Sequence, residues 1–250
     1  VSSDQQPSDN ASTILFIASS LSDQGGHSEL LKKWTNNLYN ARFVDSVNLI
    51  LTNSNNTVSE YDSLRNNLDR LLERHIELSP RESYTTRITK LVNYIDAIQP
   101  DRVLLFIHPN DVVAISSLAW DYPDCELIFI NHADHTFWLA HPSIDHFIEF
   151  RESGYQLSDI FRSIRPSGII PLTTNIHNSE SSGRFPQIPN SKSVSVSIGS
   201  FYKIKEGDRS PYLRVINQIL NENKDHHHIF VSNCHDTNLE NQHLSDISQG

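Results

Sequence analysis

The hydrophobic pattern of the chain consists of short apolar runs that alternate with segments of helical periodicity. Short apolar runs bounded by polar residues are typical of buried strands, and apolar residues that recur every three or four positions are typical of helices. We expect strands over residues 13–18, 44–51, 102–107, 126–130, 144–151, 167–172, 193–198 and 228–232. We expect helices from Ser28 onward and over residues 61–72, 88–98, 112–120, 157–164 and 212–220. Strands that alternate with helices predict parallel sheets covered on both faces.

A change of composition divides this pattern in two. Residues 173–192 are rich in Ser, Asn, Pro and Gly without apolar periodicity, which is typical of a linker. The polar residues 1–12 are expected to be disordered. We therefore predict an N-terminal Rossmann-like domain over residues 13–172 and the start of a second one over residues 193–250. A complete second domain needs roughly another 100 residues, so the predicted fold class is α/β with two Rossmann-like domains, the second incomplete in this chain.

Composition excludes several classes of function. The 250 residues are 37% hydrophobic and carry a net charge of −10, which suits a soluble protein and argues against a nucleic-acid-binding surface. The two cysteines form no CxxC motif, which argues against a disulfide framework or zinc ribbon and predicts a cytoplasmic location. No apolar run is long enough to span a membrane, although peripheral association stays open. The chain has no methionine, which indicates an excised piece or missing residues.

The most distinctive chemical feature follows the expected strand 126–130. His132, Asp134 and His135 come directly after this apolar run. In an open α/β sheet, ligands and catalytic groups gather in the crevice at the carboxyl ends of the strands. Histidine is also the side chain most easily tuned for proton transfer near neutral pH. We therefore predict a catalytic cluster here; the alternative is a strand end whose histidines only hydrogen-bond to neighbouring loops.

A glycine turn follows the first expected strand. Gly25, Gly26 and His27 stand directly before the helix that starts near Ser28. Glycines before a helix N-terminus allow backbone N–H groups to approach an anion or a sugar closely. The full GxGxxG fingerprint is absent, so a dinucleotide site is not supported.

Polar residues also follow the expected strand 102–107. His108 ends this strand and is expected to face the same crevice as His132. Asp111 is expected to cap the helix over residues 112–120 rather than to take part in catalysis.

The order of these features resembles a glycosyltransferase of the GT-B type, nearest to the large retaining group called family 4. The resemblance covers roughly residues 13–232. It rests on the Gly25-Gly26-His27 loop, the His132 turn, the segment Asp145–Arg151 followed by a helix, Ile169-Ile170-Pro171-Leu172 with Asn175, and Gly199-Ser200 with Lys203 or Lys205. Family members usually carry an arginine shortly after the glycine, where this chain has Ser200, and a late pair of glutamates that does not occur before Gly250.

The resemblance implies an acceptor-binding first domain and a second domain that binds the nucleotide-sugar donor. It implies that His132 faces the reacting sugar, helped by Asp134 and His135, and that Lys203 or Lys205 pairs with the donor diphosphate. The substrate- and donor-binding set that we carry forward is Gly25, Gly26, His27, His108, Arg151, Asn175, Ser200, Lys203 and Lys205. No metal is expected, and no cofactor is expected beyond the nucleotide-sugar co-substrate.

The function expected on this basis is transfer of a sugar from a nucleotide-diphosphate donor to a carbohydrate or other acceptor, as in polysaccharide biosynthesis. Three alternatives stay open: a metal-dependent hydrolase or phosphoesterase, a non-catalytic GT-B-like binding or scaffolding domain, and a nucleotide-sugar epimerase. The hydrolase would need metal ligands to converge from His108, Asp111, His132, Asp134 and His135.

Two further groups allow more than one interpretation. Arg151 is either an acceptor contact or the partner of Glu149 in an ion pair that orders its loop. The run His226-His227-His228 is either a metal-binding tract or a solvated turn before a strand.

Overall fold

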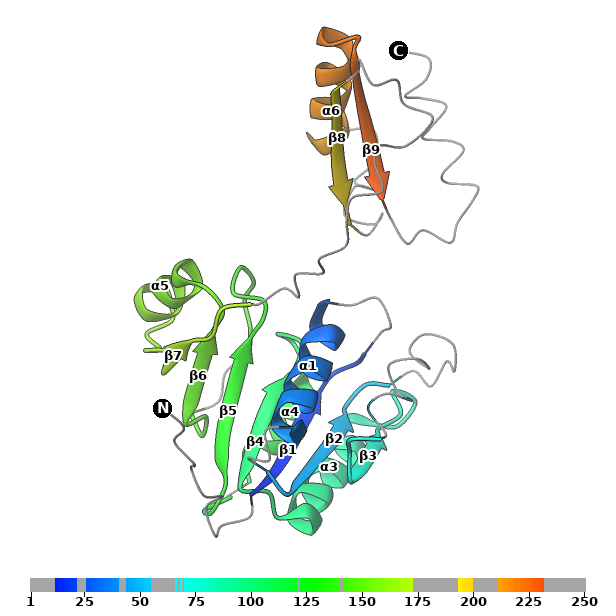
Figure 1. The fold of residues 1–250 in the computed structure, drawn as a ribbon. Coiled ribbons are helices and arrows are strands. Elements are labelled where there is room, and N and C mark those ends of the chain that lie inside the picture. Colours follow the sequence, from blue (N-terminus) through cyan, green and yellow to red (C-terminus); the bar gives the residue numbers. More distant parts are fainter. Residues whose placement is uncertain are drawn as a thin grey trace, which may run out of the picture. The chain divides into compact units, whose positions relative to one another are not determined.

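The computed structural model describes residues 12–21, 26–40, 44–54, 66, 68, 70–120, 122–139, 142–172, 193–199 and 211–231 (Figure 1). The chain forms two compact units, Val1–Thr174 and Asn175–Gly250. The predicted linker over residues 173–192 and residues 1–11 of the predicted disordered segment lie outside the described residues, so the proposed domain boundaries stay predictions.

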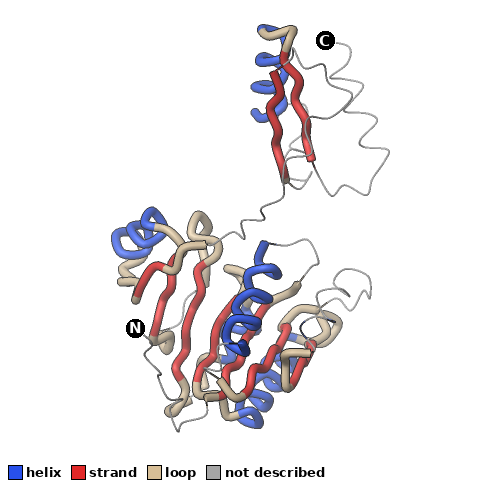
Figure 2. The backbone as a smooth tube through the Cα atoms, in the orientation of Figure 1, coloured by secondary structure: helices blue, strands red, loops and turns tan. Residues whose placement is uncertain are grey.

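The first unit contains a seven-stranded sheet in which neighbouring strands pair in parallel. The strands are β1 (Thr13–Ala18), β2 (Ser46–Leu51), β3 (Arg74–Glu77), β4 (Arg102–Phe106), β5 (Glu126–Asn131), β6 (His146–Glu149) and β7 (Gly168–Ile169). Their order across the sheet is β3-β2-β1-β4-β5-β6-β7 (Figure 1), and Figure 2 shows the strands in red in the same orientation. The α/β class with parallel sheets is thereby confirmed.

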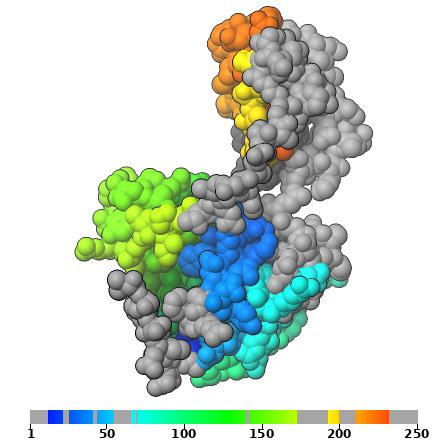
Figure 3. Space-filling model, viewed as in Figure 1, coloured from blue at the N-terminus to red at the C-terminus, as the bar shows by residue number. Residues whose placement is uncertain are grey.

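Helices cover both faces of this sheet. They are α1 (Gly26–Asn40), α3 (Tyr84–Ile98), α4 (Val112–Ser117) and α5 (Glu152–Phe161). Successive residues of β1 face opposite sides: Leu15 and Ile17 pack in the core with α3 and α4, whereas Phe16 packs in the core with Leu31 of α1. Helix α1 forms the blue surface over its face of the sheet in Figure 3. Because both faces are buried, the central strands β1, β4 and β5 are apolar runs rather than alternating patterns.

The strand order creates a switch point between β1 and β4. From β1 the chain proceeds to β2 and β3 on one side, and after α3 it returns to β4 on the other side of β1. Loops at the carboxyl ends of two such strands diverge, and in doubly wound folds ligands bind in the crevice between them. The loops that follow Ala18 and Phe106 are therefore where a site is expected in this unit.

The described part of the second unit is small. It consists of β8 (Ser193–Ile198), α6 (Pro211–Glu222) and β9 (His226–Val231), and the two strands pair in parallel. This strand–helix–strand unit matches the pattern predicted for residues 193–232, except that β9 begins at His226, so the histidine run belongs to the strand rather than to a turn before it.

Most differences between predicted and observed elements lie at their ends. Strand β3 was not predicted, because the sequence Arg-His-Ile-Glu shows neither apolar alternation nor an apolar run. Helix α5 begins at Glu152, five residues before the first apolar position used to predict it. Of the helix predicted over residues 61–72, most lies outside the described residues. Within the described residues, no helix has both the length and the apolar character needed to cross a membrane.

Candidate functional site

Three histidines converge at the switch point. His27 lies in the first turn of α1, His108 follows β4 and His132 follows β5. The rings of His27 and His132 stack with centroids 4.4 Å apart and an interplanar angle of 18°. The ring of His108 lies 6.1 Å from that of His27 and 6.3 Å from that of His132. Residues from three distant parts of the sequence thus form one histidine cluster, consisting of His27, His108 and His132.

Burial keeps two of these imidazoles neutral. Burial, and then the nearby His132 and His108, lowers the pKa of His27 to about 3. The pKa of His132 is also lowered, mainly by burial. Nε2 of His27 and Nδ1 of His132 are buried and make no hydrogen bond to the described residues. Buried polar atoms are nearly always hydrogen-bonded, so each of these two nitrogens lacks, among the described residues, the partner that its burial favours.

A buried carboxylate organises the loop that carries His108. Asp111 caps α4 by accepting a hydrogen bond of 3.0 Å from the backbone N–H of Ala114, which confirms its predicted role. It also accepts hydrogen bonds from the hydroxyls of Ser19 and Thr52, which follow β1 and β2. The Ser19 hydroxyl in turn accepts a 2.7 Å hydrogen bond from the backbone N–H of His108. The ends of three strands are therefore tied together beside the histidine cluster.

A second polar cluster lies at the ends of β5 and β6. Nε of Arg151 donates to Asp134 over 2.5 Å, and Nη2 of the same guanidinium contacts the other carboxylate oxygen. This pairing with Arg151, first through the hydrogen bonds and then through charge, lowers the pKa of Asp134. Arg151 therefore pairs with Asp134 and not, as one interpretation of the sequence proposed, with Glu149.

Glu149 is held by neutral groups instead. Its Oε1 accepts hydrogen bonds from Asn131 Nδ2 over 2.8 Å and from Ser158 Oγ over 2.5 Å. Its Oε2 is buried and makes no hydrogen bond to the described residues. Gly154, in the first turn of α5, lies so close that a Cβ built on it would stand 2.7 Å from Glu149 Oε2 and 2.6 Å from Asp134 Oδ2. A glycine is therefore required where α5 approaches the two carboxylates.

The predicted site residues separate into different environments. His132 joins His27 and His108, whereas Asp134 joins Arg151. The side chain of His135 is largely exposed and its Nδ1 stands 3.6 Å from Asp134. The expected single cluster of His132, Asp134 and His135 is therefore not one contact group, because the loop after β5 directs consecutive side chains to different neighbours.

The remaining predicted residues fall into two groups. Gly26 begins α1, and a Cβ built on it would meet no atom of the described residues within 4 Å. Gly25, Asn175, Ser200, Lys203 and Lys205 lie outside the described residues, and their roles stay predictions.

Sequence reasoning missed several polar residues of this edge. Ser19 and Asn131 each end or follow a strand, a signal that could have selected them. Glu149 ends β6 and carried the same signal, but it was considered only as a partner of Arg151. Arg87 lies within α3 and carries no signal in the sequence, because an arginine in a helix is usually solvent-exposed.

The residues of the alternative metallohydrolase do not form one metal site: His108 and His132 lie near each other, whereas Asp134 pairs with Arg151. Among the described residues, no group of three or more His, Cys, Asp or Glu side chains could hold a metal ion. His226 and His228 of β9 hydrogen-bond to the Ser195 hydroxyl over 2.8 and 2.7 Å, and His228 also contacts the Tyr212 hydroxyl over 2.7 Å. These two histidines are thus engaged in a serine–histidine–tyrosine hydrogen-bond chain.

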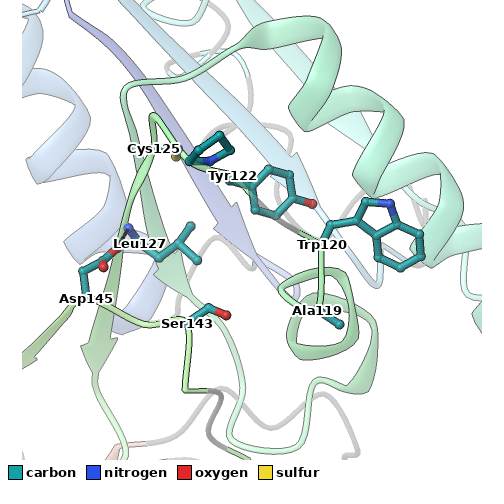
Figure 4. Close-up of a pocket in the computed structure, with 8 residues that line it drawn as sticks. Ala119, Trp120, Tyr122, Cys125, Leu127, Ser143 and Asp145 are labelled. Carbon is teal, nitrogen blue, oxygen red and sulfur yellow. Dashed lines mark hydrogen bonds between the residues drawn. The ribbon is translucent and has the colours of Figure 1, made fainter.

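A cavity of about 390 Å³ lies at the opposite edge of the sheet, near the amino ends of β5 and β6. Its lining includes Ala119, Trp120, Tyr122, Cys125, Leu127 and Asp145 (Figure 4). Burial raises the pKa of the Cys125 thiol to about 11, so it is unreactive near neutral pH. Asp145 accepts a hydrogen bond of 2.8 Å from the backbone N–H of Leu127. This cavity therefore has fewer candidate catalytic groups than the carboxyl edge of the sheet.

Comparisons with solved structures show which known fold this chain resembles. No family model and no curated protein matches the sequence. Among solved structures, the apo form of the lipopolysaccharide outer core galactosyltransferase WaaB matches with a TM-score of 0.58 at 10% identity, over 88% of this chain and 68% of that one.

Two further matches have similar scores. A putative UDP-N-acetylglucosamine 2-epimerase from Listeria monocytogenes matches with a TM-score of 0.58 at 11% identity, over 96% of this chain and 67% of that one. The S. aureus MnaA–UDP co-structure matches with a TM-score of 0.54 at 12% identity, over 95% of this chain and 65% of that one. The chain thus has a GT-B-like fold and spans about two thirds of the length of these structures.

Proposed function

We propose that the protein is a sugar-nucleotide-using enzyme, and specifically a glycosyltransferase that resembles the retaining family 4. The observation that carries this proposal is the histidine cluster, which lies at the switch point of a GT-B-like sheet and has two buried nitrogens that make no hydrogen bond to the described residues. Ligands of doubly wound folds bind at this point, and neutral imidazoles suit hydrogen bonds to sugar hydroxyls.

The chemistry of sugar transfer fits the groups at this edge. A leaving nucleoside diphosphate gains negative charge as the glycosidic bond breaks, and helix N-terminal N–H groups and cations stabilise such charge. Helix α1 begins at Gly26, where a built Cβ meets no atom of the described residues within 4 Å, so its N-terminal N–H groups are proposed to face such a group. Lys203 or Lys205 would supply the cation, and His132 would orient the reacting sugar. Because these groups supply the charge, the proposed reaction requires no metal and no cofactor.

The proposal includes the setting of the reaction. The acceptor is a carbohydrate or a related hydroxyl compound that binds the first unit, and the donor is a nucleotide sugar. The synthesis of polysaccharides in the cytoplasm is the setting that we infer from the resemblance to family 4.

A nucleotide-sugar epimerase is the second candidate, because one matching structure is that of a putative UDP-N-acetylglucosamine 2-epimerase. The two activities differ in what they need. An epimerase converts the nucleotide sugar without an acceptor, whereas a transferase moves the sugar to a hydroxyl group and releases the nucleoside diphosphate.

Product analysis separates these candidates. The full-length protein is incubated with UDP- and GDP-sugars, with and without a mixture of carbohydrate acceptors, and proton NMR follows the anomeric signals. We expect free nucleoside diphosphate and an acceptor-dependent loss of the donor signal. A new nucleotide-sugar signal without an acceptor would favour the epimerase, and unchanged donors in every mixture would refute both.

A further inference from the structure

A small cavity lies beside the histidine cluster, at the carboxyl ends of β1, β2 and β4. Its volume is about 190 Å³, and its polar lining includes Ser19, Asn53, Tyr84, Arg87, His108 and Asn110. These residues come from four separate segments that the strand order brings to one place. Of this lining, the sequence pattern indicated only His108 as a residue that faces a crevice.

The cation that lines this cavity is buried. Only 6% of the Arg87 surface is exposed. Its Nη1 donates to the carbonyl oxygen of Thr52 over 3.1 Å and to Asn53 Oδ1 over 3.5 Å. Its guanidinium carbon lies 4.8 Å from the centroid of the Tyr84 ring. Nε and Nη2 make no hydrogen bond to the described residues, so most of the donor capacity of the guanidinium is unused.

No carboxylate among the described residues forms an ion pair with Arg87. Asp111 lines the same cavity, but its oxygens accept from Ser19, Thr52 and the backbone of Ala114. A buried charge is costly unless a partner of opposite charge offsets it. Within the part of the chain that the structure describes, the charge of Arg87 therefore lacks the partner that its burial requires.

The position of Arg87 in its helix also indicates that a negatively charged partner is missing from the described residues. It lies in the first turn of α3, where the helix dipole favours negative charge. That turn contains no acidic residue, and its cap is the neutral Ser83, whose hydroxyl accepts from the backbone N–H of Thr86. A cation buried at a helix N-terminus, next to an open cavity, is suited to a bound anion.

We propose that this cavity binds a phosphate-class oxyanion, held chiefly by the free guanidinium donors of Arg87. Arginine presents parallel N–H groups that match the oxygens of a phosphate group. Asn110 and the ring of His108 would supply further polar contacts from the loop after β4. The binding of an oxyanion in this cavity does not depend on the proposed transferase function. The further assignment of the cavity as the subsite for a phosphate group of the acceptor rests on that function.

Inorganic phosphate is the probe for this site. The thermal unfolding midpoint of the full-length protein is measured against phosphate concentration, with sodium chloride at equal ionic strength as the baseline. We expect a saturable rise of the midpoint for the wild type and an affinity at least about tenfold weaker for Arg87→Gln, because a charge-assisted hydrogen bond is lost. Arg81→Gln, which removes an exposed arginine outside the cavity, should match the wild type.

A second measurement needs only the wild-type fold. The side-chain Nε–Hε signal of Arg87, in protein labelled with ¹⁵N-arginine and assigned with Arg87→Lys, should shift as phosphate is added. The absence of both a saturable midpoint rise and a signal shift would overturn the proposal, as would equal phosphate binding by wild type and Arg87→Gln. Phosphate binding without any turnover of nucleotide sugars would refute the transferase and leave the anion site standing.

Discussion

At the scale of single residues, the stacked pair of His27 and His132 combines two properties of a binding site. Both imidazoles are held neutral, and each has a buried nitrogen without a partner among the described residues. Neutral imidazoles can donate and accept hydrogen bonds, which suits hydroxyl groups better than anions. The anion is instead expected near Arg87 and the N-termini of α1 and α3.

The lowered pKa of His27 predicts how stability depends on pH. Its pKa is about 3 in the fold and 6.5 ordinarily, so between these values the unfolded chain binds a proton that the folded chain does not. The free energy of unfolding therefore falls as the pH falls through this window, with a slope of up to about 1.4 kcal/mol per pH unit. Urea unfolding between about pH 7 and pH 5 should show a steeper loss for wild type than for His27→Gln. Equal slopes would contradict the neutral, buried state of His27.

A second residue prediction concerns His132. If it orients the reacting sugar, His132→Ala should lower turnover of the nucleotide sugar by about 10²- to 10⁴-fold. Its thermal unfolding midpoint should stay close to that of wild type, because the side chain is only partly buried. His146→Ala removes a histidine from the opposite end of the sheet, at the start of β6, and should keep wild-type turnover. Joint loss of fold and activity in His132→Ala would show that His132 is structural.

At the scale of elements, the approach of α5 to the sheet depends on Gly154. Its neighbours are oxygens of Asp134 and Glu149, which are 6% and 1% exposed and cannot move into solvent freely. This contact fixes the first turn of α5 beside the strand ends, and it also fixes Arg151, which immediately precedes α5.

Gly154→Ala should therefore lower the free energy of unfolding by about 1–3 kcal/mol, the usual cost of inserting a group into a packed site. Gly168→Ala is the matched control, because a Cβ built there meets no atom of the described residues within 4 Å. Chemical denaturation of both variants measures the difference. Equal stability of the two variants would show that Asp134 and Glu149 rearrange without cost.

The elements also show how far sequence patterns reach. Strands β1, β4 and β5 are continuous apolar runs, so their existence and their burial on both faces followed directly. Four-residue β3 carries two charged residues and a histidine, so only its pairing with β2 identifies it.

The site was predictable to a smaller extent. The position of His108 and His132 after parallel strands predicted that they share a crevice. In the structure the centroids of their rings lie 6.3 Å apart. The pairing of Asp134 with Arg151 depends on how β6 and α5 pack, and the exposure of Arg87 to a cavity depends on the crossing of α3 over the sheet. Such contacts arise from tertiary packing, which local sequence patterns do not encode.

At the scale of the whole molecule, the chain shares a GT-B-like fold with sugar-handling proteins at 10–12% identity. A fold of this kind supports several activities, so the function must be argued from the site. In the first unit, the histidine cluster, the start of α1 and the Arg87 cavity all lie at the carboxyl edge. Their shared location is what favours a nucleotide-sugar enzyme over a scaffolding domain.

Calorimetric titration of the full-length protein with a panel of UDP-, GDP- and other nucleotide sugars is the decisive experiment for this assignment. We predict micromolar binding of one member, with the same affinity in the presence of a metal chelator. Absence of binding to every member would contradict a nucleotide-sugar enzyme, and binding that the chelator abolishes would contradict its metal-independent mechanism.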